Sequence, residues 1–216
     1  MLKISDIIKE ILENDEEAYF ACQRGILNFS AYAREIKKDL ENRAKKSVNL
    51  KSVIVGLSRL VKDLKAPPGS LLSETDLSLS LHSSLAEVTY EKTNQNQKIL
   101  NEVYQTAAQG HENYLVATQG LSEITIIGSQ KAVAELKRNH KNTKPIFYKE
   151  NLAGITVKFP EEFIKVPNML FALEKRLAVK RINIIELVST YTELTFIIDK
   201  KDVLAAIAQL ERHQGF

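Results

Sequence analysis

The sequence predicts an α+β protein in which an all-helical N-terminal segment precedes two units built from strands and helices. Three observations predict this class. Apolar residues recur at helical spacing over 1–65, an Ala-Pro-Pro-Gly run interrupts the chain within 66–75, and strand-like runs alternate with helical stretches beyond it. We expect a helical domain over 1–65, a linker over 66–75, a first unit over 76–150 and a second over 151–216.

The N-terminal segment has the pattern of four helices. Ser5, Ser30 and Asn49 stand where side-chain caps would begin three of them, and Gly25 ends the second. The last two helices are separated by a turn near Ser47 and resemble a helix-turn-helix, so the segment is similar to the helical part of a winged-helix domain.

Charge divides this segment in two. Residues 1–33 hold three basic and six acidic residues, whereas residues 34–65 hold ten basic and four acidic ones. A basic surplus on a helical pair is suited to phosphates, and it is also typical of the solvated face of a docking bundle. The candidate nucleic-acid contacts are Arg34, Lys37, Lys38, Lys45, Lys46, Lys51 and Arg59.

Both later units have the pattern of ferredoxin-like βαβ folds. From Leu85 to Tyr148 the order is βαββαβ, and from Leu152 to Arg212 it is βαββα, which lacks a final strand. One strand, at 76–83, is left over before the first unit. An unpaired edge strand promotes aggregation, and the second unit lacks its final strand. We therefore expect the strand at 76–83 to pair beside 152–159 and complete the sheet of the second unit.

The second unit resembles a known family. The run Val166-Pro167-Asn168-Met169-Leu170, followed by Ile182-Asn183-Ile184 and then Leu187-Val188-Ser189-Thr190, is similar to the ACT domain at the regulatory end of aspartokinases. The resemblance implies tandem ACT-like domains, side-by-side association such as a homodimer, and a bound small amino acid. The ligand-binding residues that it implies are Val166, Pro167, Asn168, Met169, Leu170, Asn183 and Ile184.

The chemistry of a helix N-terminus also favours a ligand-binding site near Pro167. A helix N-terminus carries unpaired N–H groups and partial positive charge, so the first turn after Pro167 can bind a carboxylate. Asn183 or Glu186 can accept from an amino group. Two positions depart from the family pattern: Asn168 replaces the usual Gly, and Lys165 stands near the usual Asp.

Composition and motifs limit the function classes. The chain has 216 residues, a formal net charge of +3 and a single cysteine, Cys22, which suits a reducing cytoplasm, and it has no apolar run long enough for a membrane span. Its four histidines lack partners at metal-ligand spacing, and no phosphate loop or nucleophile motif occurs. We therefore expect no metal, no cofactor and no enzyme activity.

The sequence thus predicts a regulatory protein in which an amino acid controls a helical domain that binds DNA or a protein partner. Two alternatives remain: a regulatory subunit that docks on an amino-acid-biosynthesis enzyme, and an oligomerisation module without a ligand.

Overall fold

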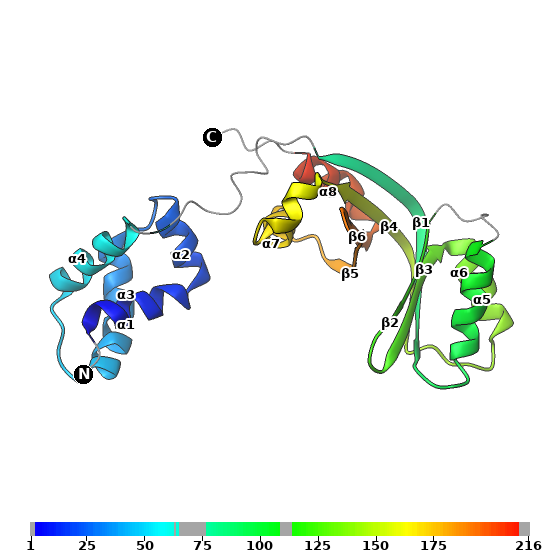
Figure 1. The fold of residues 1–216 in the computed structure, drawn as a ribbon, viewed down its shortest axis with the longest axis horizontal. Helices are drawn as coiled ribbons and strands as arrows, with labels where there is room; N and C mark the ends of the chain where they lie inside the picture. Colours follow the sequence, from blue (N-terminus) through cyan, green and yellow to red (C-terminus); the bar gives the residue numbers. More distant parts are fainter. Residues whose placement is uncertain (1–2, 63, 65–76, 109–113, 212–216) are drawn as a thin grey trace. The chain divides into compact units, whose positions relative to one another are not determined.

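The computed structural model describes residues 3–62, 64, 77–108 and 114–211, and the chain forms two units, Met1–Ser70 and Leu71–Phe216 (Figure 1). The predicted linker over 66–75 lies outside the described residues. None of the described helices is long and apolar enough to cross a membrane.

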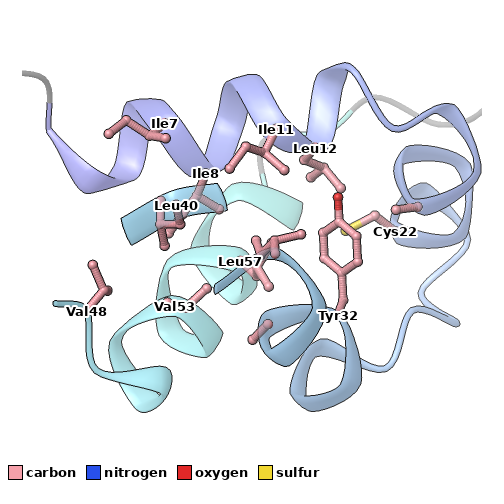
Figure 2. Close-up of a cluster of buried hydrophobic side chains, with 13 residues drawn as sticks. Ile7, Ile8, Ile11, Leu12, Cys22, Tyr32, Leu40, Val48, Val53 and Leu57 are labelled. Atoms are coloured by element: carbon pink, nitrogen blue, oxygen red, sulfur yellow. The ribbon is translucent and has the colours of Figure 1, made fainter. Parts of the chain in front are cut away.

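The first unit contains four helices: α1 (Ile4–Glu13), α2 (Glu16–Gln23), α3 (Phe29–Ala44) and α4 (Leu50–Val61). Their apolar stripes meet in one core, where α1 contributes Ile7, Ile8, Ile11 and Leu12 and the other helices contribute Cys22, Tyr32, Leu40, Val53 and Leu57 (Figure 2). Helices α1 and α4 approach closely where Gly56 of α4 faces Ile8 of α1. A Cβ placed on Gly56 would lie only 2.9 Å from Ile8 Cδ1.

Two of the three predicted caps are wrong. Helix α1 begins after Lys3 without a side-chain cap, so Ser5 lies inside it. Helix α3 begins after Asn28, whose side-chain oxygen accepts from the backbone N–H groups of Ser30 and Ala31. The extended backbone of Asn28 places its oxygen over the first turn, which leaves Ser30 inside the helix. Asn49 caps α4 as predicted.

The second unit is a single antiparallel sheet of six strands, in the order β2-β3-β1-β4-β6-β5. The α+β class with an antiparallel sheet is confirmed. The strands are β1 (Ser78–Glu91), β2 (Leu115–Gln119), β3 (Glu123–Ser129), β4 (Phe147–Lys158), β5 (Ile184–Ser189) and β6 (Glu193–Asp199). The helices are α5 (Gln97–Ala108), α6 (Gln130–Asn139), α7 (Met169–Ala178) and α8 (Val203–Leu210), with short 3₁₀ segments η2 (Glu161–Lys165) and η3 (Lys200–Asp202).

Strands β1 and β4 each run through both halves of this sheet (Figure 1). The early part of β1 pairs with the late part of β4, with Leu79 opposite Val157. This is the pairing with the second unit that we expected for the strand at 76–83. The sequence also predicted a division near residue 150, but β4 continues across it. The two expected units are therefore halves of one sheet.

The joints between the halves are backbone irregularities. The pairing of β1 with β4 shifts register between His82 and Leu85 and again between Leu85 and Glu87. Ser84 has φ 59° and Asn151 has φ 58°, so each strand accommodates an extra residue with a left-handed conformation.

The two faces of the sheet carry different cores. On one face, α5 and α6 bury a cluster that includes Val88, Tyr90 and Ile126, and α7 and α8 bury a second cluster that includes Ile155, Phe196 and Ile198. The opposite face, which we call the inner face, buries the cluster Leu85, Ile127, Leu152 and Ile197. No described helix contributes to that cluster.

Candidate ligand-binding site

The start of α7 lacks a side-chain cap. After η2 the chain is extended at Val166, and then Asn168 adopts a left-handed conformation with φ 65° and ψ 21° before Met169 begins the helix. The side chain of Asn168 does not cap the helix. The first N–H groups of α7 therefore have no side-chain acceptor at the N-cap, where partial positive charge gathers.

The backbone conformation at position 168 shows how Asn can stand where ACT domains usually have Gly. A left-handed backbone disfavours most L residues, and Asn is one of the few that adopt it readily in place of Gly. The backbone path is therefore compatible with the glycine usually found in ACT domains. What differs is the presence of a polar side chain beside the helix N-terminus.

The structure divides the predicted ligand residues into two groups. Val166, Met169 and Ile184 come together in the core under α7 and α8, and Met169 is only 7% exposed. Pro167, Asn168, Leu170 and Asn183 are exposed at the surface. The apolar members therefore stabilise the turn, and only the exposed members and the backbone are available to a ligand.

Asn183 stands immediately before β5, the last strand in the sheet order. Glu186, the other predicted acceptor, lies on the inner face because it pairs with Ile197, whereas Met169 packs on the opposite face. The structure therefore separates Glu186 from the start of α7.

Titratable side chains outside this site form no metal centre within the described residues. The His140 Nε2 atom lies 2.7 Å from a carboxylate oxygen of Glu102, and the His82 ring stacks on Tyr114 with centroids 4.5 Å apart. These histidines have structural neighbours, and His111 and His213 lie outside the described residues.

The basic surface of the first unit is the second candidate site. Lys37 forms an ion pair with Glu41 at 3.7 Å, which partly neutralises one of the predicted phosphate contacts. The other six are exposed on α3, on the turn over 45–49 and on α4: Arg34, Lys38, Lys45, Lys46, Lys51 and Arg59. Helix α4 contains no acidic residue.

Sequence reasoning missed one buried acidic residue. Glu87 is only 2% exposed and lies on the inner face, where it pairs with Ile127 and Lys149. The alternation of Leu85, Glu87 and Thr89 marks these three residues as sharing a face. Nothing in the sequence indicates that this face is covered.

Comparisons with known proteins show a likeness in fold to solved structures. No protein-family model matches the sequence, and no curated protein matches it. Among solved structures, the aspartate kinase of Clostridium acetobutylicum matches with a TM-score of 0.52 and 10% identity, over 64% of this chain and 34% of that chain. The ligand-free regulatory subunit of aspartate kinase from Thermus thermophilus matches with a TM-score of 0.50 and 14% identity, over 64% of this chain and 95% of that chain.

The chain thus spans about a third of the Clostridium enzyme, whereas the match covers nearly all of the Thermus regulatory subunit. At such low identities the likeness is one of fold. The chain contains a mixed α+β fold like that of aspartate kinase regulatory subunits, which supports the expectation of an ACT-like domain.

Proposed function

We propose that this chain is a non-enzymatic, cytoplasmic regulatory protein whose sheet-containing unit binds a small amino acid at the start of α7 and beside Asn183. The observation that carries this proposal is the left-handed turn at Asn168, which opens the α7 N-terminus within a fold like that of aspartate kinase regulatory subunits. That fold alone is compatible with several roles.

The chemistry at the site is that of α-amino acid recognition. The ligand carboxylate accepts from the backbone N–H groups of Asn168, Met169 and Leu170, favoured by the partial positive charge of the helix N-terminus. The amide oxygen of Asn183 accepts from the ligand ammonium. The backbone contacts bind any amino acid, so the exposed side chains of Pro167 and Leu170 discriminate between ligand side chains.

Control requires that the ligand bind two arrangements of the protein with different affinity. Among the described strands β5 lies at one edge of the sheet, and we propose that its outer backbone groups pair with a second copy of the chain in a homodimer. In the proposed homodimer, ligand binding beside β5 favours one packing of the two sheets. The helical unit then transmits this change.

The output is the second part of the proposal. The exposed lysines over 45–51 and the acid-free α4 favour the phosphates of DNA as the target of the helical unit. The alternative target is an amino-acid-biosynthesis enzyme such as an aspartate kinase, on which the chain would dock as a regulatory subunit. DNA binding weakens steeply as salt rises, and we expect no such dependence for docking through apolar surface.

A thermal-shift scan against the common amino acids at millimolar concentration tests the ligand proposal. An amino acid at about 100 times its Kd stabilises the protein by about 2.7 kcal/mol, which shifts the midpoint by roughly 5–10 °C at this size. We expect Asn183→Ala to abolish the shift, and Asn42→Ala, which changes an exposed Asn of α3, to leave it intact. If no amino acid shifts the midpoint, the oligomerisation module replaces the sensor.

The DNA proposal is tested separately by fluorescence anisotropy with a labelled duplex at two salt concentrations. Reversal of Lys45 and Lys51 to Glu should weaken binding at least tenfold, because each change removes a phosphate contact and adds repulsion. Reversal of Lys9, an exposed lysine that pairs with Glu13 on α1, serves as the control and should have little effect.

A further inference from the structure

The inner face of the sheet is covered although no described helix lies over it. Leu85, Ile127, Leu152 and Ile197 are each at most 2% exposed, and the partly buried Val116 of β2 and Val188 of β5 pack against them. One side of an open antiparallel sheet can face water, so burial at this level requires another layer. Within the part of the chain that the structure describes, this layer comes from β2, β5 and the residue before β2.

Interactions between distant strands identify that layer. Tyr114, just before β2, packs against the cluster that contains Ile197 of β6. Burial there raises the pKa of its phenol, and the nearby hydroxyl of Thr195 on β6 opposes this rise. In the sheet order β2 and β6 are four places apart, about 19 Å in a flat sheet. The sheet must therefore coil so that the inner faces of its two halves approach each other.

Acidic side chains meet within this layer. Glu87 of β1 is 2% exposed, and one of its carboxylate oxygens has no hydrogen-bond partner. Glu87 pairs with Ile127 and Glu186, on β5, pairs with Ile197, and these two isoleucines pack in the same inner-face cluster. In keeping with this, the charge of Glu186 acts on Glu87, and that of Glu123, on β3, acts on Glu186. In the sheet order β5 is three places from β1 and four from β3, so these interactions also cross between the halves.

One nearby cation, Lys149, compensates this charge only in part. Lys149 of β4 stabilises the Glu87 carboxylate. Its ammonium group, however, lies 3.0 Å from a carboxylate oxygen of Asp199 at the end of β6, so it is shared. The Thr89 hydroxyl also donates to Glu87, and it lies 2.9 Å from the hydroxyl of Thr125. The contact therefore holds more acid than base.

The electrostatic consequence is a carboxyl group that titrates near neutral pH. Burial, and then the charge of Glu186, raise the pKa of Glu87 to about 7, against the opposing effects of Thr89 and Lys149. Burial, and then the charge of Glu123, raise the pKa of Glu186 above its usual range.

We propose that Glu87 and Glu186 form a proton-dependent contact that closes the two halves of the sheet against each other. While Glu87 holds its proton, β5 packs over the inner face beside β1 and β3. When the proton leaves, two carboxylates oppose each other in a poorly solvated place, and the halves separate. This device does not depend on the proposed ligand site.

The direction of the pH dependence follows from linkage. Glu87 has a pKa of about 7 in the closed form, and in an open, solvated form it returns to about 4.5. The closed form thus holds a proton that the open form loses between these values. The stabilisation of the closed form is complete below about pH 4.5 and is lost as the pH rises through about 7. Between pH 5.5 and pH 8 the open population should rise roughly 30-fold.

Hydrogen exchange of the β5 and β6 amides in the full chain tests this proposal. In the wild type, protection corrected for intrinsic rates should fall roughly 30-fold between pH 5.5 and pH 8. Glu87→Gln should remove most of this dependence and leave only the part that comes from Glu186, whose own pKa is raised by burial and by Glu123. Glu91→Gln, which changes an exposed residue of the same strand, should retain it. Protection that does not change with pH in the wild type, or that changes as much in Glu87→Gln as in the wild type, would overturn the proposal.

A second variant keeps the test decisive if Glu87→Gln folds poorly. Glu186→Gln retains the titrating group and removes the charge that acts on it, so the midpoint of the pH profile should move to lower pH. A midpoint that stays in place shows that Glu186 does not face Glu87 and refutes the contact.

Discussion

Gly154 lies at the centre of the inner face, and its replacement tests the packing there. A Cβ at this position would lie 3.2 Å from three side-chain atoms: Leu85 Cδ1, Ile197 Cδ1 and Thr195 Cγ2. These atoms come from β1 and β6, on both sides of β4. A methyl group at Gly154 therefore presses on neighbours in two directions, and it can be accommodated only if they move.

Two opposing terms set the size of the effect. Replacing Gly with Ala in the interior of a strand stabilises a protein by roughly 0.5–1 kcal/mol when space is available. Overpacking a filled core costs about 1–3 kcal/mol. Because three neighbours must each move by a few tenths of an ångström, we expect Gly154→Ala to destabilise the sheet unit by about 1 kcal/mol net. Gly154→Val should cost more, because its additional methyl groups need more space.

Urea unfolding followed by circular dichroism measures this difference. Gly120→Ala is the matched control, because Gly120 lies in the β2–β3 turn and its Cβ would meet no atom nearer than 3.7 Å. The control should change the free energy of unfolding by no more than about 0.5 kcal/mol. If Gly154→Ala is as stable as the wild type or more stable, the three neighbouring side chains move aside at little cost, and the reasoning that they are tightly packed around Gly154 is refuted.

Two local predictions follow from the caps and the left-handed turn. Asn28→Ala should cost about 1 kcal/mol in the stability of the helical unit, whereas Ser30→Ala should change it little, since Asn28 accepts the two N–H bonds of the first turn; equal losses in urea unfolding would contradict the assignment. Asn168→Ala should cost roughly 1 kcal/mol and Asn168→Gly should be neutral or stabilising, because φ at this position is 65°. Equal melting temperatures for these two variants would contradict the left-handed conformation.

The elements were predictable because each carries a periodic signal. The stripe of Ile7, Ile8, Ile11 and Leu12 and the alternation of Leu77, Leu79 and Leu81 each fix a type of structure within a few residues. The pairing of Leu79 with Val157 was also predictable, because a chain with an unmatched strand and an incomplete sheet has few ways to satisfy both.

The continuity of the sheet was not predictable from the same signals. Ser84 and Asn151 interrupt the alternation of β1 and β4, and an interruption indicates either a break between two strands or a bulge within one. Local sequence cannot distinguish these, because the difference lies in whether the flanking residues keep the same neighbours. Here Leu85 pairs with Leu152 between the two irregularities, and this pair holds each long strand together.

The candidate site shows the same limit at the level of single residues. The run from Val166 to Leu170 was predicted as one set of ligand contacts, yet the structure turns Val166 and Met169 into the core and leaves Pro167, Asn168 and Leu170 outside. A motif fixes the backbone path, because only that path satisfies the turn and the helix start. It does not fix which side chains remain exposed, since this depends on the strands that arrive beneath them. A ligand at this site must therefore be recognised chiefly through the backbone N–H groups, and specificity must come from the few side chains that the fold leaves exposed.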